Sequence, residues 1–121
     1  MVKILTAEEA VALIKDNSTL VVEGFNLTVH PEALSIALEE RFKKTASPKG
    51  LTLVYCAGEG EGPGTNFCAN RYAKEGLLKR IIAGHLALGP DLGALISDNK
   101  VEAYNIPQGT ISPMYRDSAG G

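Results

Sequence analysis

The sequence lacks the features that mark several classes of protein. No stretch approaches the roughly 20 consecutive apolar residues of a membrane-spanning helix. Glu8 and Glu9 interrupt the apolar run near the N-terminus, so no signal peptide is predicted. Basic residues are not in excess, because the net charge is −2 and the isoelectric point about 5.7. We therefore expect a cytoplasmic protein whose partners include neither a membrane nor nucleic acid.

Cysteine and histidine are also scarce, with two of each. Cys56 and Cys68 form no CxxC motif, and His30 and His85 belong to no HxxH or HxxxH pair. These spacings predict reduced core thiols, no metal site and no tightly bound cofactor. The sequence also contains no GxSxG nucleophile elbow and no P-loop.

What the sequence does contain is a repeated unit of short apolar strand, loop and helix. Strands are expected over 19–25, 50–58, 79–85 and 101–105, and helices over 6–17, 31–44, 69–78, 90–98 and 110–119. Strands that are apolar on both faces and joined by helical crossovers predict an α/β fold. The expected architecture is an open, mainly parallel sheet with helices on both faces, and residues 1–121 form one domain.

Four loops follow the predicted strands, over 24–30, 57–66, 84–85 and 106–109, and ligands of open α/β sheets bind at such strand ends. The amide of Gln108 can both donate and accept hydrogen bonds, and Gly109 lets the first N–H groups of the next helix face the same place. His30 precedes a helix N-terminus, and His85 ends a strand, where it could contact a ligand or satisfy a loop carbonyl. Turn chemistry alone also explains glycine at these positions.

The loop 57–66, "AGEGEGPGTN", is glycine-rich but does not fit a dinucleotide site. It contains no GxGxxG, no helix follows it directly, and Glu59 and Glu61 would repel a pyrophosphate. A mobile acidic loop is the favoured interpretation. Acid–base catalysis by the two glutamates is disfavoured, because flexible neighbours of glycine are seldom held in a reacting geometry.

Three ordered blocks stand out: "GFNLTVHPEAL" at 24–34, "EGLLKRIIAGHLALGPDLGALISDNKVEAYNIPQGTI" at 75–111 and "PQGTISPMYRDSAGG" at 107–121. Together they resemble the amino-terminal region of family I coenzyme A transferases, particularly the acetate/propionate type, and the last block is similar to one of the family's ketoacid branch. The resemblance implies transfer of CoA between short-chain carboxylic acids through a glutamyl-CoA thioester. The family's nucleophilic glutamate lies in the carboxyl-terminal half within Glu-Asn-Gly or Glu-Ser-Gly, and neither tripeptide occurs here.

We therefore expect a truncated amino-terminal domain that is inactive alone, with CoA as a substrate and no catalytic residue of its own. Its expected partners are acyl-CoA, short-chain carboxylates, the carboxyl-terminal half of the enzyme and further copies of itself. The predicted substrate-binding residues are Gly24, Phe25, His30, Gly84, His85, Gln108 and Gly109. Two alternatives remain: a non-catalytic module that binds acyl-CoA or carboxylates, and a domain like that of a sugar-phosphate isomerase.

Overall fold

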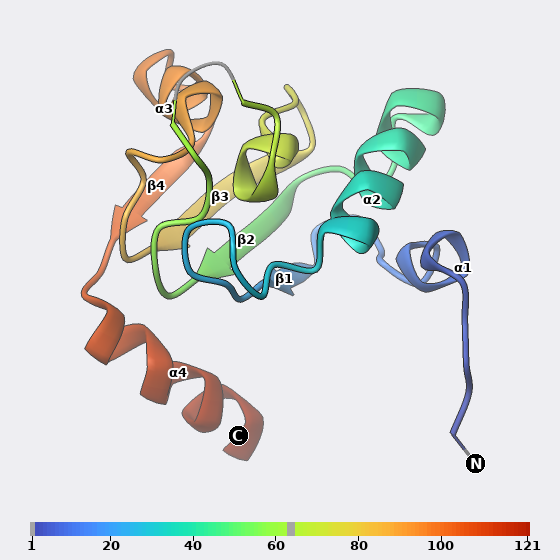
Figure 1. Cartoon of the computed structure of the whole chain (residues 1–121), viewed down its shortest axis with the longest axis horizontal. Coiled ribbons are helices and arrows are strands. Elements are labelled where there is room, and N and C mark those ends of the chain that lie inside the picture. The colour runs from blue at the N-terminus through green and yellow to red at the C-terminus, as the bar shows by residue number, and fades with distance from the viewer. Residues whose placement is uncertain (1, 63–64) are drawn as a thin grey trace.

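The computed structural model describes residues 2–62 and 65–121 and confirms the open α/β sheet. Four strands, β1 (Thr19–Val21), β2 (Leu51–Tyr55), β3 (Leu78–Ala83) and β4 (Glu102–Asn105), lie in this order and all run parallel (Figure 1). Parallel strands end at a common edge, so the order brings all four strand exits together. None of the helices in the described part of the chain has the length and apolar content needed to cross a membrane.

Helices lie on both faces of this sheet. The elements α1 (Ala7–Val11), α2 (Glu32–Thr45), the 3₁₀ helix η1 (Cys68–Tyr72) and α3 (Pro90–Ser97) contribute to the main core with Leu53 and Ile81. Helix α4 (Gln108–Gly120) packs on the other face, where Ile111 contacts Val54 and Ile82. Neighbouring residues of one strand therefore belong to opposite faces, as the alternation of a β-strand requires.

The face that carries α4 is only partly covered. Register places Val21 beside Val54, Val54 beside Ile82, and Ile82 beside Tyr104. The two outer members of this row, Val21 and Tyr104, remain 49% and 45% exposed. A cavity of about 500 Å³ opens there between the strands and α4. This face therefore presents apolar surface that α4 leaves uncovered.

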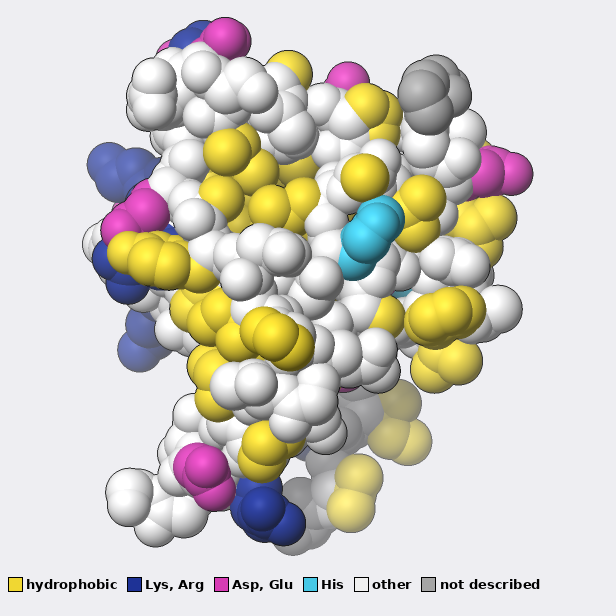
Figure 2. All heavy atoms as spheres, turned by 90° about the vertical axis from the view of Figure 1, so that its left-hand side faces the viewer, with side chains coloured by type: hydrophobic (Ala, Val, Ile, Leu, Met, Phe, Trp, Pro, Cys, Tyr) yellow, Lys and Arg dark blue, Asp and Glu magenta, His cyan; other side chains and the backbone are white. Residues whose placement is uncertain are grey.

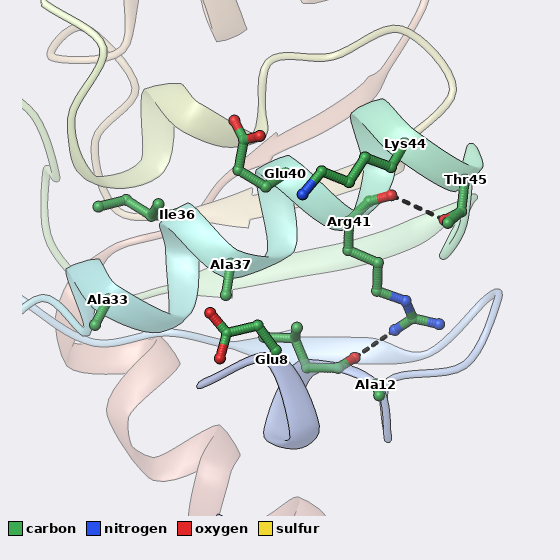
Figure 3. A pocket seen from close by; sticks show the side chains of 10 residues that line it. Glu8, Ala12, Ala33, Ile36, Ala37, Glu40, Arg41, Lys44 and Thr45 are labelled. Carbon is green, nitrogen blue, oxygen red and sulfur yellow. Dashed lines mark hydrogen bonds between the residues drawn. The ribbon is translucent and has the colours of Figure 1, made fainter. Parts of the chain in front are cut away.

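The first helix begins as predicted and ends earlier. Thr6 and Glu9 form the expected capping box, with Glu9 N donating to Thr6 Oγ1 at 3.2 Å and Thr6 N donating to the Glu9 carboxylate at 2.9 Å. Helix α1 ends at Val11, whereas the sequence predicts an end near residue 17. The Arg41 guanidinium of α2 donates to the carbonyls of Val11 and Ile14, so it satisfies acceptors that another helical turn would use (Figure 3).

Two further predictions about helices are corrected. The helix expected over 69–78 is the short 3₁₀ helix η1, because Gly76 adopts a φ of +88° and the chain then enters β3 at Leu78. Helix α4 begins at Gln108 rather than at Thr110. The sequence predicts Pro113 in the first turn of this helix, but because the helix begins earlier, Pro113 lies inside it.

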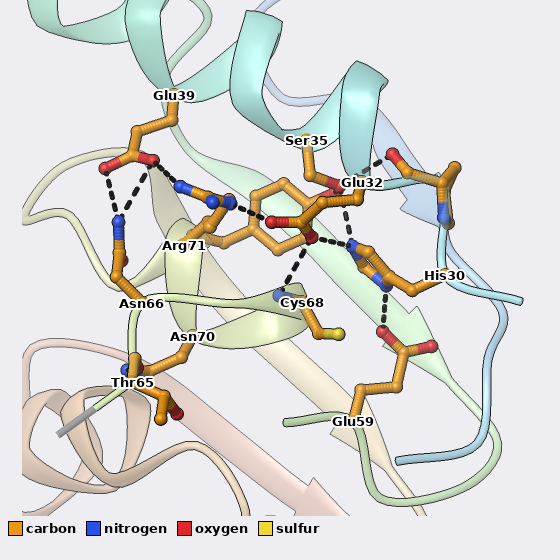
Figure 4. A network of polar contacts seen from close by, with 12 residues as sticks. His30, Glu32, Ser35, Glu39, Glu59, Thr65, Asn66, Cys68, Asn70 and Arg71 are labelled. Carbon is orange, nitrogen blue, oxygen red and sulfur yellow. Dashed lines mark hydrogen bonds and ion pairs between the residues drawn. The ribbon is translucent and has the colours of Figure 1, made fainter. Parts of the chain in front are cut away.

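A buried carboxylate on α2 joins this helix to η1. The Glu39 side chain is 3% exposed and pairs with Lys43 at 2.9 Å, Arg71 at 2.9 Å and Lys74 at 3.2 Å (Figure 4 includes Glu39 and Arg71). Burial alone would raise the pKa of Glu39, but hydrogen bonds from the three cations lower it to about 2. The carboxylate is thus held charged well below its usual range.

This pKa predicts a loss of stability in acid. A carboxyl whose pKa is depressed in the folded state contributes stability above its unfolded value, and the contribution is lost as pH falls through the folded value. Between about pH 4.5 and 2, Glu39 should account for a loss of up to about 3 kcal/mol in the free energy of unfolding. Urea denaturation of wild type and Glu39→Gln across this range measures it. The exposed neighbour Glu40 provides the control, Glu40→Gln, and equal pH dependence in all three proteins would contradict the assignment.

Candidate functional site

A groove of about 290 Å³ lies where the four strands end. Figure 2 shows this side of the molecule, with hydrophobic side chains gathered toward its middle and charged ones nearer its margins. The lining residues come from all four strand exits and from the loop before α3: Phe25, Asn26, Cys56, Ala57, Gly58, Gly84, His85, Leu88 and Gln108. The topology therefore assembles one site from segments that are more than 80 residues apart in sequence.

Four of the seven residues predicted from the sequence line this groove: Phe25, Gly84, His85 and Gln108. Gly24 faces away from it, because a Cβ at this position would lie 3.0 Å from the Thr28 carbonyl oxygen and 3.2 Å from the Glu59 carboxylate. Gly109 belongs to the first turn of α4, and a Cβ there would meet open space.

His30 does not line the groove. Its side chain is 1% exposed, and its Nδ1 lies 2.6 Å from the Glu59 carboxylate (Figure 4). Its Nε2 lies 2.7 Å from Ser35 Oγ, which in turn contacts the Tyr72 hydroxyl at 2.6 Å. The structure thus places His30 in a buried polar network beneath the loop after β1.

The expectation of a mobile acidic loop is wrong for Glu59. This side chain is fully buried, whereas Glu61 is exposed; Pro63 and Gly64 of the same predicted loop lie outside the described residues. Backbone hydrogen bonds explain the difference, because Asn26 N donates to Gly58 O at 2.8 Å and Gly60 N donates to Asn26 O at 3.1 Å. These bonds and the contact between His30 and Glu59 hold together the two loops that form one wall of the groove.

The opposite wall depends on close backbone approach and on an asparagine. A Cβ on Gly84 would lie 1.9 Å from the carbonyl oxygen of Cys56, so only glycine allows β3 to leave the sheet here. Asn105 donates its side-chain amide to the carbonyls of Ala83 at 3.1 Å and Gly84 at 3.0 Å. The exits of β3 and β4 are therefore tied together directly beside His85 and Gln108.

Hydrogen-bond donors and apolar side chains both face this groove. Gln108 lines the groove and is the first residue of α4, so its N–H group lacks an intrahelical acceptor and is available to an oxygen ligand. The His85 ring packs on the backbone of Gly58, where a Cβ would lie 2.8 Å from Nδ1. Phe25 and Leu88 contribute apolar surface. Such a groove can hold a small group that carries a carbonyl or carboxylate oxygen.

No nucleophile is evident among the described groups of the groove. Cys56 is buried, and burial raises the pKa of its thiol, which keeps it protonated. Both cysteines are free and buried, as predicted. The Glu59 carboxylate is engaged by His30. Glu102 does not line the groove, and its carboxylate accepts a hydrogen bond from Arg80 Nε at 2.6 Å. The site can therefore bind and polarise a ligand, and its own side chains offer no activated carboxylate.

Comparison with known proteins gives one consistent result. The family model described as Coenzyme A transferase matches residues 4–121. Acetate CoA-transferase YdiF of Escherichia coli (strain K12) is 34% identical over 119 residues, which are 98% of this chain and 22% of that protein. Caffeate CoA-transferase of Acetobacterium woodii is 32% identical over 119 residues, with the same shares of 98% and 22%.

A solved structure agrees with these relatives. The acyl-CoA transferase YdiF of Escherichia coli O157:H7, in a thioester complex with CoA, superposes with a TM-score of 0.89 at 33% identity. The match covers 96% of this chain and 24% of that chain. The chain thus spans between a fifth and a quarter of the length of these three proteins.

Proposed function

The chain belongs to the coenzyme A transferase family, and from this premise we propose that its groove forms part of the acyl-CoA site of a short-chain acyl-CoA:carboxylate CoA transferase. The observation that carries the proposal is that His85 and Gln108, the first residue of α4, line one groove at the strand ends. The small volume and the presence of Phe25 and Leu88 favour a short acyl chain.

The proposed chemistry is acyl transfer through a carboxylate nucleophile. A glutamate carboxylate attacks the thioester carbonyl, and the C–S bond breaks to give a glutamyl–acyl anhydride and a CoA thiolate. The thiolate then attacks the glutamyl carbonyl of the anhydride, whose C–O bond breaks to release the first carboxylate and leave a glutamyl-CoA thioester. The second carboxylate opens this thioester by the reverse steps and leaves as the new acyl-CoA. Each tetrahedral intermediate carries an oxyanion, which preorganised N–H donors stabilise. In this chain those donors are the N–H groups at the start of α4 and the Gln108 amide. CoA is a substrate in this scheme, and no resident cofactor is required.

The nucleophile is proposed to come from a carboxyl-terminal part of the enzyme. The family's Glu-Asn-Gly and Glu-Ser-Gly tripeptides do not occur in this sequence. We propose that this partner also covers the sheet face that α4 leaves open, where Val21 and Tyr104 are about half exposed. The same exposed face would favour association with a second copy of the chain. The free buried thiols of Cys56 and Cys68 are consistent with a cytoplasmic location.

The chain alone is expected to be catalytically inert, because its groove lacks a nucleophile. Incubation with acetyl-CoA and propionate should give no propionyl-CoA above the rate without protein, as measured by chromatography. Hydroxylamine should trap no modified glutamate on the chain. Turnover that disappears in Glu59→Gln or Glu61→Gln would contradict the proposal, since it would place the nucleophile within this chain.

A further inference from the structure

Another cavity, of about 300 Å³, shares no lining residue with the groove. It is lined by Leu27, His30, Glu32, Glu61, Phe67 and Cys68. Three of these side chains bring metal-ligand atoms together: one ring nitrogen of His30, a Glu32 carboxylate oxygen and Cys68 Sγ all lie within 4.8 Å of one another (Figure 4). We propose that His30, Glu32 and Cys68 form a binding site for a divalent transition-metal ion of the zinc class.

The three donors match the chemistry and geometry of such an ion. Imidazole nitrogen, carboxylate oxygen and thiolate sulfur are the groups that bind Zn²⁺, at about 2.0–2.3 Å. Ligands at those lengths around a tetrahedral ion lie about 3.4–3.8 Å apart. His30 Nε2 and Glu32 Oε2 are already 3.7 Å apart. To complete a tetrahedral ligand set, Cys68 Sγ would have to move about 1 Å closer to the His30 and Glu32 ligand atoms.

The buried network orients His30 for coordination. Nδ1 lies 2.6 Å from the Glu59 carboxylate, and a proton donated there leaves Nε2 unprotonated, where it accepts from Ser35 Oγ at 2.7 Å. A metal ion would take the Nε2 lone pair in exchange for this hydrogen bond. A carboxylate on the distal nitrogen is the common outer partner of a metal-bound histidine. Ser35 Oγ, which now contacts Nε2, would keep its contacts to the Pro31 carbonyl at 3.2 Å and to Tyr72 at 2.6 Å.

Charge at the cavity also favours a cation. The Arg71 guanidinium donates to Oε1 of Glu32, and the other carboxylate oxygen, Oε2, lies 3.7 Å from His30 Nε2. A metal ion replaces the thiol proton, which is released to solvent, and the thiolate and carboxylate together balance its two charges. Glu61, exposed at the same cavity, or a water molecule supplies the fourth ligand.

This proposal departs from the sequence-based expectation of no metal site. That expectation considered the spacing of ligands along the chain, where no pair resembles a metal motif. The fold supplies the ligands from the loop before α2, from the first turn of α2 and from the start of η1. Because the first and last of these ligands are 38 residues apart, no local pattern reveals them.

Titration of the chelator-treated, reduced chain with Co²⁺ tests the site without any measurement of catalysis. We expect one equivalent to bind with a near-ultraviolet thiolate-to-cobalt absorption band, and Zn²⁺ to abolish the band by displacement. Cys68→Ser should lose the band, whereas Cys56→Ser, which removes the other buried thiol, should keep it. Glu59→Gln should weaken binding by about 10- to 100-fold.

A second measurement uses the wild-type chain and so does not depend on whether Cys68→Ser folds. Zn²⁺ should slow alkylation of Cys68 by iodoacetamide and leave that of Cys56 unchanged, as mapped by mass spectrometry. Absence of the cobalt band in the wild type, a band that survives in folded Cys68→Ser, or equal alkylation of Cys68 with and without Zn²⁺ would each overturn the proposal. None of these results bears on CoA transfer.

Discussion

Gly84→Ala is expected to lower the free energy of unfolding by about 3 kcal/mol, because the added methyl group would overlap with backbone atoms. An ideal Cβ at this position would lie 1.9 Å from the carbonyl oxygen of Cys56 and 3.1 Å from its carbonyl carbon. Both atoms belong to the backbone of the segment that leaves β2, so no side-chain rotation can relieve the overlap. The exits of β2 and β3 would have to separate, and the groove would widen.

Chemical denaturation of wild type and Gly84→Ala measures this effect directly. Gly93→Ala is the matched control, because Gly93 lies in α3 and a Cβ there meets nothing within 4 Å. Helix propensity predicts that the control gains up to about 1 kcal/mol. A Gly84→Ala protein as stable as the wild type would show that the two strand exits do not approach each other as described.

The second large effect is expected at Gln108 in the complete transferase. In the proposed role, Gln108 donates one neutral hydrogen bond to the acyl or carboxylate oxygen, and Gln108→Ala would leave that oxygen short of a partner. Such a loss costs about 1–3 kcal/mol, and each 1.36 kcal/mol is tenfold in rate. We therefore expect kcat/KM to fall by roughly 5- to 100-fold. Gln108→Glu should be worse, because its charge repels carboxylate substrates.

Stability separates this role from a structural one. Gln108 is exposed at the start of α4, so neither variant should lower the melting temperature appreciably. Thr110→Ala, two residues further along the same helix and outside the groove, should leave kcat/KM unchanged. If Gln108 only stabilised the turn, its variants would melt earlier and retain normal turnover. Unchanged kcat/KM in both Gln108 variants would remove this residue from the site.

The sheet and half of the site could be predicted from the sequence because both depend on local pattern. Continuous apolar runs identified β2 and β3, and the rule that ligands bind beyond parallel strands placed Phe25, His85 and Gln108 at one edge. The lengths of α1 and η1 could not be predicted in the same way. Helix α1 ends where Arg41, about 30 residues further along the chain, binds the carbonyls of Val11 and Ile14. The positive φ of Gly76 prevents a helix from continuing after η1.

The role of Glu59 shows most clearly what local pattern misses. Its glycine neighbours suggested flexibility, yet its partner His30 lies 29 residues earlier and the pair is buried by the approach of two loops. Asn26 and Leu88 were missed in the groove for a related reason, since neither residue type signals a binding role by itself. Asn105 was missed as well, because the two carbonyls that it binds, of Ala83 and Gly84, lie 22 and 21 residues earlier on another strand.

The most direct test of the proposed role is CoA transfer by this chain when it is fused to the carboxyl-terminal part of acetate CoA-transferase YdiF, the part without a counterpart here. We expect the fusion to convert acetyl-CoA and propionate into propionyl-CoA, and the chain and the YdiF part to be inactive separately. Gln108→Ala in the fusion should lower the rate as described above. A folded fusion that binds CoA and transfers none, or a chain that is active by itself, would contradict the account.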